Sequence, residues 1–121
     1  MATIKFRTAD EFIESKKPIF QPMLLLARQT ILETSANIYE KMAYNTPFFY
    51  QNSWLCYLAA NQKDCWIGFT EGIHLNLPFL EAGDRKQIRI LRLDPQLPFP
   101  SEFLQCAVWA AIEYDSEKTS H

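Results

Sequence analysis

The spacing of apolar side chains predicts helices at both ends of the chain. Beyond Pro18 and Pro22, which a helix tolerates only near its start, apolar residues recur at steps of four, three and four. They are Phe20, Leu24, Ala27 and Ile31. This period places them on one face of a helix that we expect to end near Thr34.

Two further helices are indicated by their first residues. Thr8 precedes Glu11 by three positions, which is the spacing of a capping box, and a short helix is expected from there to about Ser15. Near the end of the chain, Ser101 is placed to cap a last helix. The apolar stripe of that helix consists of Leu104, Ala107, Val108, Ala111 and Ile112.

Between these helices the pattern changes to that of strands. Residues 37–70 are rich in aromatic and β-branched side chains, and turn-forming residues interrupt them three times. The interruptions fall at 45–47, 51–53 and 61–64. We therefore expect four short antiparallel strands, then an irregular excursion over residues 71–84, and a fifth strand over residues 85–93.

This order of elements predicts an α+β fold, a two-layer sandwich in which an antiparallel sheet of about five strands packs against the N-terminal and C-terminal helices. With 121 residues, 48% of them hydrophobic, the chain suits a single domain over 1–121. The longest apolar run, MLLLA, is far shorter than the roughly 18 residues of a membrane span, and the N-terminus lacks an apolar signal segment. We expect a soluble cytoplasmic protein with no membrane partner. The formal net charge of -2 disfavours nucleic acid as a partner.

Two of the three cysteines, Cys56 and Cys65, lie in adjacent predicted strands. A hairpin turn centred on residues 62 and 63 pairs Cys56 with Phe69, and alternation then puts both thiols on the same face of the sheet. They would lie about 13 Å apart along it, beyond the Cα separation of roughly 7 Å that limits a disulfide. A zinc site is not expected either, because the sequence offers no further ligands at C-x-x-C spacing. Both thiols should pack in the core.

The same register separates the two faces of the hairpin. The face that the helices should cover carries Trp54, Cys56, Leu58, Ala60, Cys65, Ile67 and Phe69. The outer face carries Leu55, Tyr57, Ala59, Trp66, Gly68 and Thr70. Aromatic rings beside a glycine on a solvent-facing sheet are typical of a contact surface, so Tyr57 and Trp66, helped by Arg89, are candidates for binding a protein or a small ligand. Alternatively, residues 71–84 could fold back over this face.

The run YEKMAYNTPFFYQNSWLCYLAA, followed by a turn and CWIGFTEG, resembles the YdhG-like domain-of-unknown-function family. In that family an acidic residue precedes a tyrosine, a proline and aromatics ahead of a β-hairpin. The matching residues here are Glu40, Met42, Tyr44, Pro47, Phe48, Ile67, Gly68, Phe69 and Gly72, with Arg85 to Leu93 fitting the late strand. The resemblance covers nearly the whole chain and implies a frataxin-like sandwich.

Some members of this family are described as intracellular iron chaperones, which implies iron held by surface carboxylates. Frataxins concentrate acidic side chains on the first long helix, whereas here that helix offers Glu33 alone. The candidates on this chain are therefore Asp10, Glu11 and Glu14 of the short helix, since carboxylates are suitable hard ligands. Beyond iron, no cofactor is expected.

The remaining polar residues give weaker signals. Four cations, Arg85, Lys86, Arg89 and Arg92, could meet an anionic ligand or could keep an edge strand soluble. Glu40 could pair with a neighbour of Lys41 or with an arginine of that strand across the sheet. His74 has no accompanying nucleophile motif, so no catalytic residue is assigned.

We therefore predict a small noncatalytic binding module, with a frataxin-type iron chaperone as the alternative and an enzyme using His74 as a third hypothesis. An aromatic sheet face or an unpaired edge could also support a homodimer.

Overall fold

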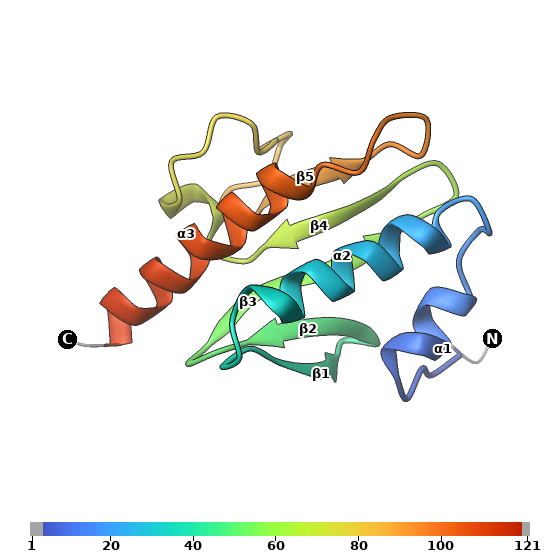
Figure 1. Cartoon of the computed structure of the whole chain (residues 1–121), viewed down its shortest axis with the longest axis horizontal. Coiled ribbons are helices and arrows are strands. Elements are labelled where there is room, and N and C mark those ends of the chain that lie inside the picture. Colours follow the sequence, from blue (N-terminus) through green and yellow to red (C-terminus); the bar gives the residue numbers. More distant parts are fainter. Residues whose placement is uncertain (1–3, 120–121) are drawn as a thin grey trace.

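The computed structural model of the chain describes residues 4–119 and contains three α-helices, one short 3₁₀ helix and five strands (Figure 1). The helices are α1 (Ala9–Glu14), α2 (Gln21–Thr34), the 3₁₀ helix η1 (Gly72–His74) and α3 (Ser101–Thr119). The strands are β1 (Tyr39–Ala43), β2 (Thr46–Tyr50), β3 (Trp54–Ala60), β4 (Cys65–Phe69) and β5 (Arg89–Leu93). Within this part of the chain, no helix combines the length and the apolar character that crossing a membrane requires.

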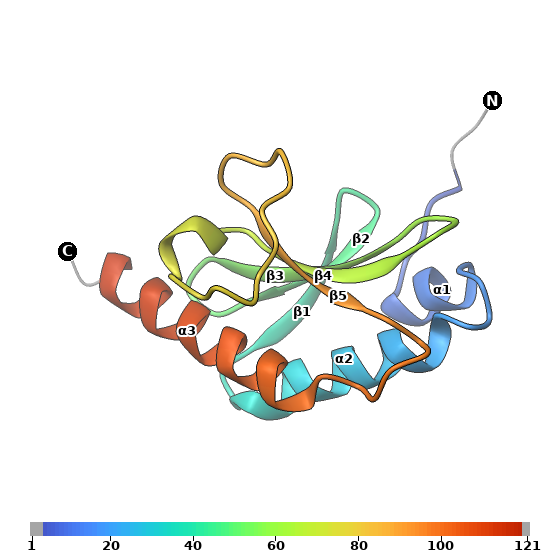
Figure 2. The same cartoon turned by 90° about the horizontal axis from the view of Figure 1, so that it is seen from above.

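The strands form one antiparallel sheet in the order β1-β2-β3-β4-β5, so each strand lies beside its neighbours in the sequence. Helices α2 and α3 pack against each other and cover one face of this sheet (Figure 2). The core lies between the two layers, where residues such as Leu24, Phe49 and Val108 are fully buried. The predicted two-layer α+β sandwich is confirmed.

The fifth strand is shorter than predicted, because its first residues are bonded elsewhere. The ladder with β4 begins at Arg89, whereas the carbonyl of Gln87 accepts a hydrogen bond of 2.9 Å from the backbone N–H of Ile73 in η1. On its other side, Ile90 exchanges two backbone hydrogen bonds of 2.9 Å with Glu81. The excursion after β4 therefore returns along the edge of β5 and partly covers it.

The register between β3 and β4 is the predicted one. Cys56 lies opposite Phe69 and Cys65 lies opposite Ala60, and both thiols are free and completely buried. Burial raises the pKa of the Cys56 thiol, and burial together with the charge of Asp64 raises the pKa of Cys65 to about 11. Both side chains therefore stay protonated and act as small apolar groups in the core.

A β-bulge between β2 and β3 reverses the predicted orientation of two residues. Phe49 pairs with Cys56 but Tyr50 pairs with Trp54, so Leu55 is the extra residue of the bulge. The prediction placed Trp54 under the helices and Leu55 outside, and it was wrong. Leu55 is 2% exposed and belongs to the core, whereas Trp54 is 36% exposed on the outer face.

Asp115 of α3 holds the turn that precedes this bulge. Its carboxylate is buried and accepts hydrogen bonds from the backbone N–H of Asn52 at 2.8 Å and of Ser53 at 3.4 Å. The hydroxyl of Ser53 donates a further hydrogen bond to it. Because a buried carboxylate requires donors in place of water, this arrangement fixes the turn to α3 and sets the position from which β3 begins.

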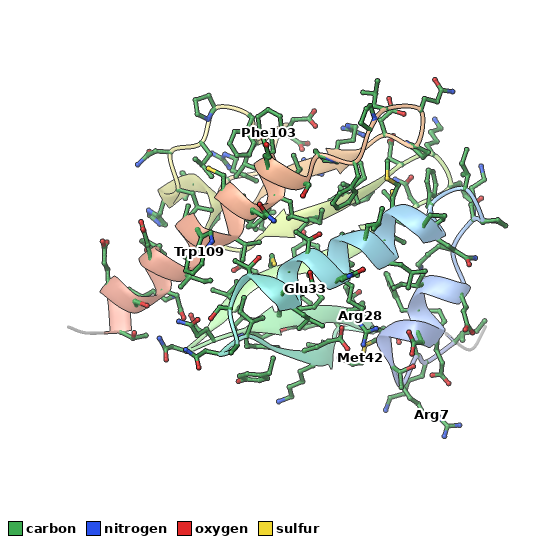
Figure 3. All side chains as sticks on the ribbon, in the orientation of Figure 1. Arg7, Arg28, Glu33, Met42, Phe103 and Trp109 are labelled. Atoms are coloured by element: carbon green, nitrogen blue, oxygen red, sulfur yellow. The ribbon has the colours of Figure 1, made fainter. Side chains whose placement is uncertain are left out.

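Glu40 of β1 pairs with Arg28 of α2. Figure 3 shows Arg28 where α2 lies close to α1 and β1. Two hydrogen bonds of 2.5 and 3.0 Å join the guanidinium to the carboxylate, and they raise the pKa of Arg28. The pairing of Glu40 with an arginine of β5 was wrong, because β1 and β5 lie at opposite edges of the sheet.

Candidate functional site

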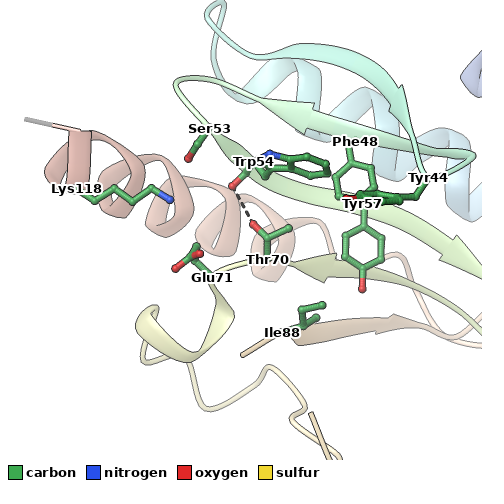
Figure 4. A pocket seen from close by; sticks show the side chains of 9 residues that line it. All are labelled: Tyr44, Phe48, Ser53, Trp54, Tyr57, Thr70, Glu71, Ile88 and Lys118. Carbon is green, nitrogen blue, oxygen red and sulfur yellow. Dashed lines mark hydrogen bonds between the residues drawn. The ribbon is translucent and has the colours of Figure 1, made fainter. Parts of the chain in front are cut away.

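A groove crosses the outer face of the sheet, opposite the helices. Figure 2 shows the β1–β2 turn and the segment before β5 rising above this face on its two sides. The groove has a volume of about 490 Å³. Its lining comprises Tyr44, Phe48, Ser53, Trp54, Tyr57, Thr70, Glu71, Ile88 and Lys118 (Figure 4).

The segment over residues 71–84 leaves this groove open. Its helix η1 packs beside α3, where the ring of His74 stacks on Tyr114 with centroids 4.9 Å apart and planes 6° from parallel. Farther along, Glu81 is bonded to Ile90 at the edge of the sheet. The segment over residues 71–84 therefore borders the outer face, with Glu71 in the lining of the groove, but it does not close the groove.

The groove has an aromatic wall and floor. The ring of Phe48 meets Trp54 edge to face at 4.5 Å between centroids and lies 5.1 Å from the ring of Tyr57. Tyr44 extends this cluster, with its ring 5.8 Å from that of Trp54. Phe48 is 8% exposed, so it supports the other rings from below. Rings held at these separations give a preformed apolar surface for a flat group.

Tyr44 stands at the edge of the groove in an unusual backbone conformation. It has a φ of 51° and Asn45 has a φ of 60°, so the two residues form a tight hairpin turn of the type that favours asparagine and glycine. The side chain of Asn45 is bonded to the backbone of Ile4 and Phe6, which explains this asparagine. No such side-chain hydrogen bond explains the conformation of Tyr44. Tyr44 is 84% exposed, and a left-handed backbone conformation costs a bulky residue about 1 kcal/mol.

Tyr57 lies flat across Gly68 of the neighbouring strand. A methyl group on Gly68 would come within 2.1 Å of the Cζ atom of Tyr57, so only glycine leaves room for this ring. Burial raises the pKa of Tyr57, while the charge of Arg85 and the indole of Trp66 act in the opposite direction. These effects place Arg85 and Trp66 near the phenol, although neither of them lines the groove.

The other end of the groove is polar. Glu71 accepts a hydrogen bond of 2.7 Å from the side-chain amide of Gln87, and its carboxylate lies 3.7 Å from Nε2 of His74. The hydroxyl of Thr70 donates to the carbonyl of Trp54 at 2.9 Å. Lys118 extends its ammonium group into this end, 5.7 Å from the ring centroid of Tyr114 (Figure 4).

The predicted ligand-binding residues are only partly brought together. Tyr57 lines the groove, while Trp66 lies on the same face opposite Ala59 and outside the lining. Arg89 lies opposite Phe69 and therefore on the helix-covered face, where it donates to the carbonyl of Ile88 at 2.9 Å. The structure corrects the expectation that Arg89 assists the outer face, because Arg89 lies on the other face. The arginine whose charge acts on Tyr57 is Arg85.

Three other aromatic residues of the groove were not predicted as binding residues from the sequence. Tyr44 and Phe48 were noted only as parts of a family pattern, and Trp54 was assigned to the wrong face. Tyr44 beside Asn45 in a short turn was the available signal, since an aromatic residue in such a turn is uncommon.

The predicted metal-ligating residues do not gather at one point. Glu11 accepts a hydrogen bond of 2.6 Å from the backbone N–H of Arg7, and Asp10 lies 3.5 Å from Arg28. Among residues 4–119, no three side chains of histidine, cysteine, aspartate or glutamate are arranged to hold a metal ion. Asp10, Glu11 and Glu14 thus stay a prediction that rests on the family resemblance.

His74 is half exposed and does not line the groove, although the neighbouring Glu71 does. Arg92, another member of the cationic cluster, forms ion pairs with Asp64 at 3.0 Å and Glu81 at 3.3 Å on the surface. Exposed pairs of this kind contribute little to stability, so they serve mainly to keep the edge of the sheet polar.

Comparisons of the chain with protein-family models, with curated proteins and with solved structures found no match. A function for this chain therefore has to be inferred from the geometry of the groove.

Proposed function

We propose that the chain is a small noncatalytic binding module that holds a flat apolar group, from a small ligand or from a protein partner, in the groove on the outer face of its sheet. The observation that carries this proposal is Tyr44, an exposed aromatic ring kept in a costly backbone conformation beside other rings. Strained residues on an exposed surface are typical of binding sites.

The dimensions of the groove support a small flat ligand. Its volume of about 490 Å³ falls within the range of roughly 300–1,000 Å³ common for small-molecule sites. Its lining combines four aromatic residues and Ile88 with four polar residues, and apolar walls with a few polar groups are the usual composition of such sites. An aromatic contact contributes about 1 kcal/mol, so several rings acting together provide a useful affinity.

The frataxin-type iron chaperone and the YdhG-like family membership remain proposals from the sequence resemblance, and no contact among the described residues favours the iron site. Anaerobic titration of the protein with ferrous iron decides this alternative. Heat release that disappears in an Asp10→Asn, Glu11→Gln, Glu14→Gln variant would support it, and no heat at micromolar protein would remove it.

Replacing Tyr44 with asparagine should weaken the binding of a flat neutral probe, 2-naphthamide, by about fivefold, the equivalent of one aromatic contact. The same change should leave the free energy of unfolding unchanged or raise it by about 1 kcal/mol, because asparagine accepts the positive φ more readily. Binding is measured by NMR titration of the ¹⁵N-labelled protein, and stability by urea denaturation.

Tyr39 provides the matched control. It is 52% exposed on β1 and stacks on Tyr50, but it lies outside the groove. Tyr39→Asn should leave the affinity for 2-naphthamide unchanged. The proposed function would be refuted if 2-naphthamide shifted no groove resonance, or if both substitutions weakened its binding equally.

A further inference from the structure

One cation that lines the groove and a second one near its edge form no ion pair within the described part of the chain. Lys118 extends its ammonium group into the polar end of the groove. Arg85 does not line the groove, but its charge acts on the phenol of Tyr57, which does. Among residues 4–119, none of the ion pairs involves either of them. The guanidinium of Arg85 donates to the carbonyl of Ala82 at 3.3 Å, which leaves most of its donors unused.

One carboxylate, Glu71, lines the groove among the described residues. Its oxygens are already engaged, because the amide of Gln87 donates to Oε1 at 2.7 Å and Nε2 of His74 lies 3.7 Å from Oε2. Tyr114 also lies against Glu71, because desolvation and then the charge of Glu71 and a hydrogen bond to it raise the pKa of that phenol. Glu71 is thus oriented by these neighbours and does not neutralise Lys118 directly.

We propose that the ligand held in this groove is a planar aromatic acid, a small molecule whose ring lies against Trp54 and Tyr57 and whose carboxylate meets Lys118 or Arg85. This inference rests on the proposed function, and it adds the chemical class of the ligand. Lys118 and Glu71 line the groove and Arg85 acts on Tyr57 from beside it, so cations outnumber carboxylates around this apolar surface. A flat anion complements both the apolar surface and the positive charge, whereas a cationic ligand would be repelled by Lys118 and Arg85.

The test compares two probes of the same shape, 2-naphthoate and its neutral isostere 2-naphthamide. The unmodified protein should bind 2-naphthoate about threefold to fivefold more tightly, which is the size of effect expected for partly exposed charges. In a Lys118→Gln, Arg85→Gln double variant this preference should be lost, and 2-naphthoate should bind no more tightly than 2-naphthamide, because Glu71 still opposes the anion. In Glu71→Gln, which keeps an acceptor for Gln87, the preference for 2-naphthoate should grow by about threefold.

Lys63 serves as a charge control, because it is exposed in the β3–β4 turn and outside the groove. Lys63→Gln should leave the preference for 2-naphthoate unchanged, and added salt should reduce that preference only in proteins that keep Lys118 and Arg85.

The possible failures are distinguishable. If 2-naphthamide binds in the groove but 2-naphthoate binds no more tightly, the acid is the wrong class and the binding module stands. If the preference persists in the double variant, it does not arise from these two cations and the inference is overturned. If neither probe binds, the proposed function fails and this inference fails with it.

Discussion

Replacing Asp115 with alanine is expected to lower the free energy of unfolding by about 3 kcal/mol, because hydrogen bonds to a buried charged acceptor are among the stronger ones and their donors would lose their partner. The substitution removes the acceptor for the backbone N–H groups of Asn52 and Ser53 and for the hydroxyl of Ser53. Alanine gains helix propensity, and the loss of an acidic group near the C-terminus of α3 is itself mildly favourable. A large net loss of stability would therefore have to come from the hydrogen bonds that Asp115 accepts from Asn52 and Ser53.

The control for Asp115 is Glu113, an exposed carboxylate on the same helix. Glu113→Ala should change the free energy of unfolding by less than about 0.5 kcal/mol in urea denaturation, as surface substitutions usually do. The affinity for 2-naphthamide should fall in Asp115→Ala as well, because the turn at Asn52 and Ser53, which Asp115 holds, sets the position of Trp54. Equal stability of the two variants would contradict a structural role for Asp115.

The register of the β3–β4 hairpin could be predicted because its turn is short and its strands alternate cleanly. Centring the turn on residues 62 and 63 was enough to pair Tyr57 with Gly68 and to bury both Cys56 and Cys65. In such a hairpin, the pairing depends on neighbours that are close in the sequence. The face that forms the groove was therefore found correctly.

The orientation of Trp54 could not be predicted in this way, because it depends on a distant residue. The hydrogen bond between Asn52 and Asp115 spans 63 residues, and it helps set the bulge that turns Trp54 outward and Leu55 inward. Alternation through the turn gave the opposite result. Arg89 was expected to assist the outer face. In a strand, however, residues two positions apart point to the same face, so Arg89 lies on the helix-covered face together with the buried Leu91.

Replacing Gly68 with alanine should abolish most of the binding at the groove while costing little stability. The new methyl group would lie 2.1 Å from Cζ and 2.4 Å from the hydroxyl oxygen of Tyr57, so this ring has to leave its position. The far end of a side chain can swing away at small cost, and alanine lowers the backbone entropy of the unfolded chain. We expect at least about tenfold weaker binding of 2-naphthamide, since the displaced ring both withdraws a contact and occupies the groove.

The position of the Tyr57 ring can be followed through its ionisation. Burial raises the pKa of Tyr57 in the unmodified protein, so in Gly68→Ala, where the phenol is released to solvent, its pKa should fall toward the ordinary value of about 10. A pH titration of the ¹³Cζ resonance of Tyr57 measures this change. An unchanged pKa would mean that the ring has stayed over residue 68 and that the backbone has moved instead.

Gly72 serves as the control for Gly68, because a methyl group added at Gly72 would collide with backbone atoms and not only with a side chain. Its added methyl group would lie 2.6 Å from the backbone nitrogen of Arg89 in β5, which cannot swing aside. Gly72→Ala should therefore lower the free energy of unfolding by about 2 kcal/mol, the usual cost of overpacking, and should leave the pKa of Tyr57 in the folded protein raised. Opposite profiles for the two alanine variants would show that Gly68 is retained for the position of a ring in the groove and Gly72 for packing. If Gly68→Ala lost as much stability as Gly72→Ala and still bound the probe, Tyr57 would be a packing residue rather than part of the binding surface.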